Sequence, residues 1–261
     1  MRDVLCSVIN NFEIAQDIFC MTLKLPDTFD EKCIPGQFAE LKIPHHNEHV
    51  LRRPISINTF DKDNNTVTFA YQVVGKGTAV LSELKEGDKV LVLLPLGNGF
   101  TRLNNKKILM VGAGIGAAPL KYYAEEYSDN EITAVLGFRN SDKIYQSDDF
   151  KKICSNVHIC TDDGSNGIKN YAAVLAKDVA SRNNFDHIVA CGPNIVLKQV
   201  AELANELNIP CELSLEARMG CGIGACMGCN VTVRDSNGNK IYKRCCSDGP
   251  VFDSKEVVFD E

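Results

Sequence analysis

The first hundred residues show the two-residue alternation of apolar and polar side chains that is typical of half-buried β-strands. Residues 67–73 alternate Val, Phe, Tyr and Val with Thr, Ala and Gln, and residues 89–94 form a second strand pattern. Turn-forming residues separate these segments, as in the Asp- and Asn-rich stretch 61–65 and at Pro35 and Gly36. Short strands at this spacing predict an antiparallel β-barrel.

The pattern changes near residues 104–106, after which short apolar runs alternate with segments of helical periodicity. Strands that alternate with helices indicate βαβ units and therefore a parallel sheet. The predicted strands are 108–111, 132–138, 157–160 and 187–190, and the predicted helices extend from the first strand to Tyr127 and then cover 171–181 and 195–207.

The last part of the chain differs again, because it is rich in Cys and Gly and contains a turn pattern at 235–238. The chain therefore divides into three predicted domains. These are an antiparallel β-barrel over residues 1–102, a parallel-sheet α/β domain over residues 103–212 and a small Cys-rich domain over residues 213–261.

The composition is that of an ordinary folded protein. The chain has 261 residues, 44% of them hydrophobic and 24% charged, which excludes extensive disorder. A formal net charge of −6 argues against nucleic acid or an anionic membrane as a partner. No uncharged run approaches the ~20 apolar residues of a membrane-spanning helix, and the polar start lacks the pattern of a secretion signal. We therefore expect a cytoplasmic protein.

The 12 cysteines are unusual for this length, and their even number would suit a disulfide framework in a secreted protein. In a reducing cytoplasm they are more often buried apolar residues, metal ligands or redox groups. His45, His46 and His49 lie in a polar loop, which we expect to be solvated rather than metal-binding. Six cysteines lie in or beside apolar runs and are expected in the core: Cys6, Cys20, Cys33, Cys154, Cys160 and Cys211.

Three cysteines have the spacing of plant-type [2Fe–2S] ligands, Cys221-x4-Cys226-x2-Cys229, and Cys245 or Cys246 would complete the set. Neighbouring glycines let a loop wrap closely enough for backbone N–H groups to point at the sulfur atoms. A structural zinc site and an oxidised disulfide pair are the alternatives, but zinc loops usually pair two Cys-x2-Cys knuckles and this run has one. The spacing does not choose between Cys245 and Cys246.

Two glycine-rich segments have the setting of phosphate-binding turns. Residues 75–78, Gly-Lys-Gly-Thr, precede a predicted helix over 79–84, so free backbone N–H groups gather at a helix start. Residues 112–119, Gly-Ala-Gly-Ile-Gly-Ala-Ala-Pro, follow a strand and open a helix, as a dinucleotide-binding turn requires. The usual acidic residue about twenty positions later is missing, and Arg139 leaves both NAD and NADP open.

The Cys-rich segment carries a family resemblance. Residues 215–229 and the run Cys-Ser-Asp-Gly-Pro-Val-Phe at 246–252 resemble the electron-transfer subunits of B-type dihydroorotate dehydrogenases, a ferredoxin-reductase-like family. The resemblance covers essentially the whole chain. It implies that the fourth ligand stands two residues before Asp-Gly-Pro, which selects Cys246 and leaves Cys245 as a bystander. The implied metal ligands are Cys221, Cys226, Cys229 and Cys246.

The same resemblance implies roles for motifs that are weak alone. The run 52–57, Arg-Arg-Pro-Ile-Ser-Ile, would otherwise be a basic strand start, although Arg suits a flavin diphosphate. Cys191 in Cys-Gly-Pro would otherwise be a buried residue before a helix start, and the family places it near the nicotinamide. The implied FAD-binding residues are Arg53, Pro54, Ile55, Ser56, Ala70, Tyr71, Gln72, Gly77 and Thr78, and the implied NAD-binding residues are Gly112, Gly114 and Gly116.

By resemblance, the chain holds one FAD and one [2Fe–2S] cluster and uses NAD(H) as substrate. Hydride would pass between NADH and FAD, and the cluster would relay single electrons. The implied partner is the FMN-containing catalytic subunit, in a heterotetramer of two of each chain that serves pyrimidine biosynthesis. The alternatives are the flavin and iron–sulfur subunit of an NAD(P)H-ferredoxin oxidoreductase or of a sulfide dehydrogenase, and a structural zinc protein.

Overall fold

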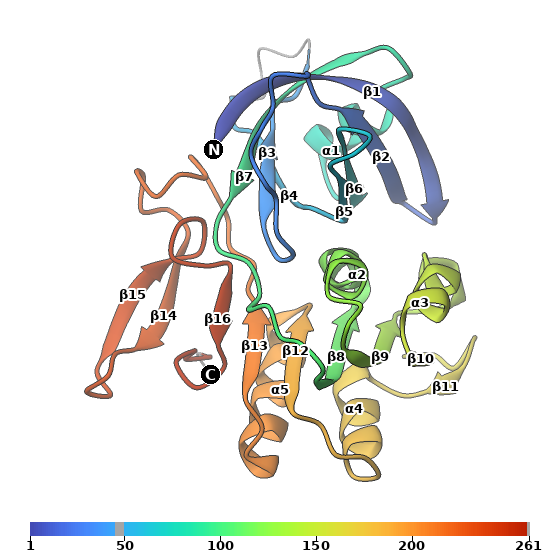
Figure 1. Cartoon of the computed structure of the whole chain (residues 1–261), viewed down its shortest axis with the longest axis vertical. Helices are drawn as coiled ribbons and strands as arrows, with labels where there is room; N and C mark the ends of the chain where they lie inside the picture. Colours follow the sequence, from blue (N-terminus) through green and yellow to red (C-terminus); the bar gives the residue numbers. More distant parts are fainter. Residues whose placement is uncertain (45–49, 260–261) are drawn as a thin grey trace.

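The chain forms two large β-sheets and a small two-stranded hairpin (Figure 1). The computed structural model describes residues 1–44 and 50–259. The predicted cluster of His45, His46 and His49 lies outside the described residues, so our expectation about it stays a prediction. None of the helices in the described part of the chain is long and apolar enough to cross a membrane.

The first sheet is antiparallel and curls around its buried face, which confirms the predicted barrel domain (Figure 1). The predicted alternation is present in β6, where Val67, Phe69 and Tyr71 are buried in one core. No backbone ladder joins the two edge strands, β4 and β5, among the residues described. In sheet order the strands are β4 (Arg53–Ser56), β3 (Phe38–Leu41), β7 (Lys89–Leu96), β1 (Arg2–Ala15), β2 (Ile18–Lys24), β6 (Thr66–Gln72) and β5 (Thr59–Asp61).

The helix expected at 79–84 lies earlier in the chain, as α1 (Lys76–Ser82). The reason is the side chain of Thr78, which closes the first turn. Its hydroxyl accepts hydrogen bonds from the backbone N–H groups of Val74 (3.0 Å) and Gly75 (3.2 Å) and donates one to the Gly75 carbonyl (3.0 Å). The glycine-rich turn therefore forms part of the helix instead of preceding it.

The second sheet is parallel except at one edge, and helices cover both faces, which confirms the predicted α/β domain (Figure 1). Its central strand β8 is buried on both sides, as a parallel sheet requires. In sheet order the strands are β11 (Ile168–Lys169), β10 (Asn156–Thr161), β9 (Glu131–Phe138), β8 (Lys107–Ala113), β12 (His187–Cys191), β13 (Cys211–Ser214) and β16 (Val251–Asp253). Helices α2 (Ala117–Glu126) and α3 (Ser147–Ile153) pack on one face, and α4 (Ala172–Ala180) and α5 (Asn194–Leu207) on the other; short 3-10 turns cover Gly114–Gly116 and Ser141–Lys143.

The Cys-rich segment is attached to the second sheet. Its last strand, β16, pairs antiparallel with β13 and extends that sheet by one strand. Its other two strands, β14 (Asn230–Arg234) and β15 (Lys240–Arg244), form a separate hairpin. The predicted turn closes this hairpin, because the Gly238 N–H donates to the Asp235 carbonyl at 2.9 Å. The short strand β16 has too few residues to show a periodic pattern.

The order of the parallel strands places a crevice at the carboxyl ends of β8 and β12. The chain runs from β8 outward to β9 and β10, and later returns to β12 and β13 on the other side. Open α/β sheets bind their ligands at such a switch point. The glycine-rich turn after β8 and Cys191 at the end of β12 both lie at this edge, which faces the first sheet (Figure 1).

A buried hydrogen-bond network joins the barrel to the helices α2 and α3 of the α/β domain. Asn58, which is fully buried, donates from Nδ2 to the Ala118 carbonyl (2.8 Å) and to Gln146 Oε1 (3.1 Å). Gln146 Nε2 donates back to Asn58 Oδ1 at 2.9 Å. Buried polar groups are costly when they lose their partners. This network is therefore one of the contacts that hold the barrel on the α/β domain, together with the hydrogen bonds of Tyr122 to Cys33 and of Lys143 to Gln16.

We expect Asn58→Ala to lower the free energy of unfolding by about 1–3 kcal/mol, because it leaves the Ala118 carbonyl and the Gln146 amide without buried partners. Urea denaturation of the purified chain measures this change. The exposed Asn237→Ala is the matched control and should change stability by less than about 0.5 kcal/mol. Equal stability of the two variants would show that the network does not hold the domains together.

Candidate functional site

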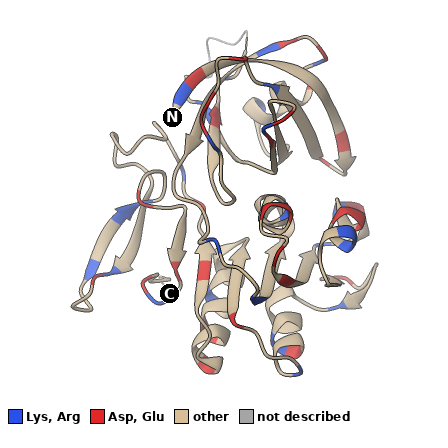
Figure 2. Ribbon diagram, viewed as in Figure 1, with Lys and Arg blue, Asp and Glu red and all other residues tan. Residues whose placement is uncertain are grey.

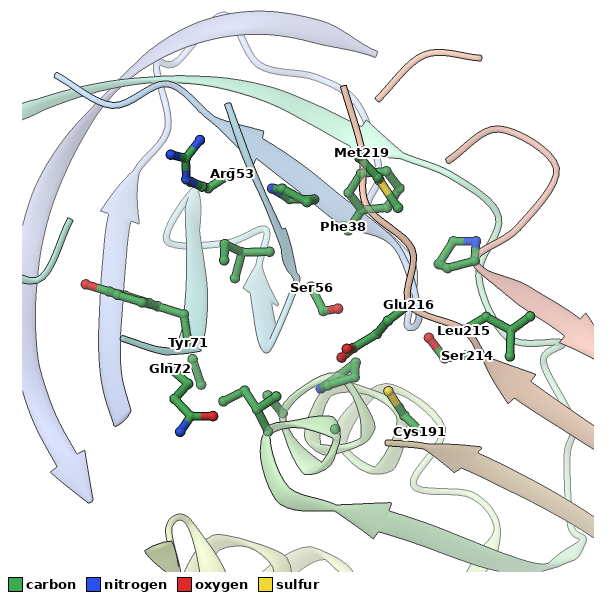
Figure 3. A pocket seen from close by; sticks show the side chains of 18 of the residues that line it. Phe38, Arg53, Ser56, Tyr71, Gln72, Cys191, Ser214, Leu215, Glu216 and Met219 are labelled. Atoms are coloured by element: carbon green, nitrogen blue, oxygen red, sulfur yellow. The ribbon is translucent and has the colours of Figure 1, made fainter. Parts of the chain in front are cut away.

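A cavity of about 450 Å³ lies where the barrel, the carboxyl edge of the parallel sheet and the start of the Cys-rich segment meet (Figure 3). Strands β4 and β6 form one wall. The turn before α2 and the end of β12 form the second. Residues 214–219, which lead from β13 toward the cysteine loop, form the third. Residues from all three predicted domains therefore surround one space.

The cavity collects the residues predicted to bind flavin, with Gly77 as the exception. Phe38 and Val74 also line it. Sequence analysis missed these two because neither belongs to a motif. Among the predicted nucleotide-binding glycines, Gly116 lines the cavity, whereas Gly112 and Gly114 lie in the adjoining turn. The predicted flavin residues on the wall are Arg53, Pro54, Ile55, Ser56, Ala70, Tyr71, Gln72 and Thr78.

Arg53 places a cation at one end of the cavity. Its Nη1 donates to the Leu51 carbonyl at 2.6 Å, and it forms no ion pair with a carboxylate in the described part of the chain. A Cβ on Gly77 would lie 2.3 Å from Arg53 Nε, so a side chain at this position would displace the guanidinium from its place beside α1. A cation beside the backbone N–H groups at the start of α1 fits a diphosphate.

The dinucleotide-type turn is held tightly against β12. A Cβ on Gly116 would lie 2.4 Å from the Cys191 carbonyl oxygen, so glycine is needed for this approach. Gly114 adopts a φ of +56°, which glycine tolerates best. The buried Tyr145 hydroxyl donates to the carbonyls of Gly114 (3.2 Å) and Ile115 (3.1 Å) and so holds the turn in place. The turn has the geometry that close approach to a pyrophosphate requires.

Cys191, Ser56 and Glu216 project into the cavity from three different elements (Figure 3). Burial raises the pKa of Cys191 to about 12, so its side chain is a neutral thiol. Burial also raises the pKa of Glu216. Sequence analysis gave Glu216 no role, because it lies outside the cysteine spacing. Its only signal was its place within the run 215–229.

The four predicted metal ligands lie in two segments that are joined by hydrogen bonds to sulfur. Cys221 Sγ accepts a hydrogen bond from the backbone N–H of Cys226 at 3.4 Å. Cys246 Sγ accepts one from the N–H of Gly224 at 3.1 Å, and Cys229 Sγ accepts one from the N–H of Cys246 at 3.4 Å. Backbone donors aimed at sulfur are a means by which proteins tune iron–sulfur clusters.

Cys245 and Cys246 have different partners. The buried Cys245 thiol donates to the Leu215 carbonyl at 3.3 Å, in the wall of the cavity. Cys246, by contrast, faces the Gly224 amide in the cysteine loop. This difference supports Cys246 as the fourth ligand. All 12 cysteines are free thiols, and the six expected in the core are buried, as predicted.

The donor set fits a two-iron cluster. The pKa of Cys221 is lowered to about 6, chiefly by the hydrogen bond that its sulfur accepts from the Ile223 N–H. Burial raises the pKa of Cys246 to about 12. Within the described residues, no three Cys, His, Asp or Glu side chains converge on a single metal ion. A [2Fe–2S] cluster is held by four thiolates that are spread over two irons.

Glu40 is a buried carboxylate beside the cysteine loop. It is 1% exposed, and neither carboxylate oxygen has a hydrogen-bond partner among the residues described. A Cβ on Gly222 would lie 2.6 Å from Glu40 Cγ, so the loop packs directly on this side chain. Burial raises the pKa of Glu40 to about 7, although the positive charge of Arg52 acts to lower it. In the sequence it is one polar residue in a strand, and nothing marks it.

Residues 216–258 match the family model for the iron–sulfur cluster binding domain of dihydroorotate dehydrogenase B. The chain is 38% identical to the dihydroorotate dehydrogenase B (NAD(+)) electron transfer subunit of Fusobacterium nucleatum, over 98% of both chains. It is also 38% identical to the corresponding subunit of Caldanaerobacter subterraneus, over 97% of both chains.

Solved structures show the same architecture. An NADH-dependent reduced ferredoxin-NADP oxidoreductase, described for flavin-based electron bifurcation, matches with a TM-score of 0.84 and 33% identity over 97% of this chain and 89% of that chain. Phthalate dioxygenase reductase matches with a TM-score of 0.66 and 18% identity over 94% of this chain and 77% of that chain, and shares the fold.

We expect Glu40→Gln to be more stable than the natural chain at pH 8, by up to about 3 kcal/mol, and to lose this advantage at pH 5. Between about pH 4.5 and 7 the folded carboxyl keeps a proton that the unfolded one releases, so the stability of the natural chain falls as the pH rises. Denaturation at both pH values measures the difference. Glu202→Gln, on the exposed side of α5, is the control. A pH-independent difference would contradict this assignment.

Proposed function

Because this chain belongs to the family of dihydroorotate dehydrogenase B electron transfer subunits, we propose that it moves electrons between NAD(H) and the catalytic subunit of that enzyme. The observation that carries the proposal is the single cavity lined by the flavin motif, the nucleotide turn and the segment that leads to the cysteine loop. A protein that connects a two-electron carrier to a one-electron carrier needs these sites beside each other.

Each cofactor has a set of residues in this chain. FAD would lie in the cavity, with Arg53 and the start of α1 at its diphosphate and β4 and β6 along its ring system. The four thiolates of Cys221, Cys226, Cys229 and Cys246 would hold the cluster. When bound, FAD exchanges an electron pair with NADH and the cluster passes electrons one at a time.

The protein residues would position the reactants. Gly116 keeps the nucleotide turn close to Cys191, whose neutral thiol packs at the place proposed for the nicotinamide. Across the cavity, Ser56 Oγ and the Glu216 carboxyl supply hydrogen-bonding groups (Figure 3). Burial raises the pKa of Glu216, so its carboxyl takes up a proton more readily than an exposed carboxyl does.

The catalytic partner subunit would dock over the cysteine loop. Cys226 is exposed, and the neighbouring Ile223 and Met227 are 48% and 50% exposed. Apolar side chains that surround a redox centre at the surface suit a protein partner. We propose that this partner carries FMN, oxidises dihydroorotate in pyrimidine biosynthesis and assembles with this chain as a heterotetramer of two of each. No nucleic acid or membrane partner is proposed.

Two further proposals concern cofactor choice and location. NAD(H) is proposed as the nucleotide because the matching subunits of Fusobacterium nucleatum and Caldanaerobacter subterraneus are named for NAD(+), although Arg139 is exposed just beyond β9. A reducing compartment, the cytoplasm, suits a chain whose cysteines are free thiols. The likeness to the NADH-dependent reduced ferredoxin-NADP oxidoreductase keeps an NAD(P)H-ferredoxin oxidoreductase as the second candidate.

Reconstitution with the catalytic subunit tests the function. The complex should reduce NAD⁺ with dihydroorotate, whereas the chain alone should oxidise NADH with an artificial acceptor but leave dihydroorotate unchanged. NADH absorbance follows both reactions. Turnover of dihydroorotate by the chain alone, or electron delivery to ferredoxin but not to the catalytic subunit, would contradict the proposal.

The adjacent cysteines provide a matched pair of variants. Cys246→Ser should lose most of the bound iron and sulfide, because it removes a cluster ligand. Cys245→Ser should keep both, because that thiol bonds to the Leu215 carbonyl instead. Iron and sulfide analysis with visible absorption spectra distinguishes them. If Cys245→Ser loses the cluster and Cys246→Ser keeps it, the ligand assignment is wrong.

A further inference from the structure

The β14–β15 hairpin carries several Lys and Arg residues (Figure 2). One of them, Arg244 at the end of β15, contacts the cysteine loop. Its Nη1 donates to the Gly224 carbonyl at 3.2 Å. Its Nε and Nη2 donate to Oδ2 and Oδ1 of Asp248, each at 3.0 Å. The guanidinium therefore connects the segment that carries Cys246 to the loop between Cys221 and Cys226.

Gly224 is held from both sides by these contacts. Its N–H donates to Cys246 Sγ at 3.1 Å while its carbonyl accepts from Arg244. Its φ is +80°, and a Cβ at this position would lie 2.8 Å from Ser247 Oγ. The loop has little freedom to shift here, and the guanidinium maintains the hydrogen bond to the sulfur.

The charge of Arg244 matters as well as its geometry. Arginine remains protonated throughout the accessible pH range. Four thiolates give an iron–sulfur cluster a negative charge, and the reduction potential of a cluster depends on nearby charge and on hydrogen bonds to sulfur. Asp248 forms a bidentate pair with Arg244, so removal of the guanidinium would leave an unpaired carboxylate two residues from Cys246.

We propose that Arg244 is a positioning residue for the [2Fe–2S] cluster, which holds the Gly224 amide against Cys246 and raises the reduction potential of the cluster. This inference rests on the proposed function, because it requires that the four cysteines hold a cluster. Arg244 touches neither the nucleotide turn nor the flavin cavity, so its effect should be confined to the one-electron end of the chain.

Lys243 is a suitable control because it is the preceding residue of the same strand. It pairs with Glu256 and lies 5.8 Å from the centre of the Phe252 ring, away from the cysteine loop. Lys243→Met therefore removes a cation from the hairpin and leaves the contacts of Gly224 in place.

The experiment is an EPR-monitored redox titration of the complete chain, together with iron and sulfide analysis and the flavin potential. We expect Arg244→Gln to lower the cluster potential by about 59 mV. This shift corresponds to a tenfold smaller equilibrium constant for one-electron reduction of the cluster. Arg244→Lys should keep most of the potential, because it keeps the charge. Asp248→Asn should shift the potential in the opposite direction, because it removes an anion. Lys243→Met should leave the cluster potential unchanged. The flavin potential should be the same in every variant.

The outcomes separate this inference from the proposed function. If the natural chain binds no iron and sulfide, the proposed function fails. If the natural chain holds a cluster and the cluster potentials of Arg244→Gln and Lys243→Met are equal, the inference about Arg244 is wrong. If Arg244→Gln fails to fold, Arg244→Lys and Asp248→Asn decide. If the cluster potential shifts in the same direction in these two variants, or does not shift in Asp248→Asn, the role of Arg244 is purely structural.

Discussion

Hydrogen bonds such as those of Asn58 to Ala118 and Gln146 hold the β-barrel against the carboxyl edge of the parallel sheet, where the candidate cavity lies. In this sheet the strand order proceeds outward from β8 on one side and from β12 on the other. A parallel sheet has a crevice at the carboxyl ends of its strands where the order reverses in this way. The barrel covers this crevice with strands β4 and β6, which carry the residues predicted to bind flavin. Ser56 of the barrel and Cys191 of the parallel sheet both line the cavity.

The Cys-rich segment is attached to the same edge by contacts that differ in kind. β16 extends the parallel sheet, and the Cys245 thiol bonds to the Leu215 carbonyl in the cavity wall. The cysteine loop itself has few apolar residues and is shaped by hydrogen bonds to sulfur and by the Arg244–Asp248 pair. Such a loop cannot bury enough apolar surface to hold its shape alone. Its order depends on the sheet behind it and on the hydrogen bonds to sulfur.

Much of the fold and part of the site were predictable because the signals are local. The alternation in β6 and the helical period of α5 follow from the faces that these elements bury, and both elements appear where they were expected. The start of α1 was misplaced because a threonine side chain, not an apolar pattern, closes its first turn. Glu216 and Glu40 were missed because their importance comes from burial beside other elements, which a linear pattern does not record.

The sequence by itself determined the chemistry that is available: a cysteine spacing that suits two irons, glycines where a backbone must approach a phosphate, and an arginine before a strand. These depend on covalent spacing and on backbone freedom, which are properties of neighbouring residues. Only the tertiary structure decided which groups act together. Cys245 and Cys246 are equivalent by spacing, yet one thiol turns to the Leu215 carbonyl and the other to the Gly224 amide. That choice is made by contacts with residues 22 and 30 positions away in the chain, and no local pattern contains it.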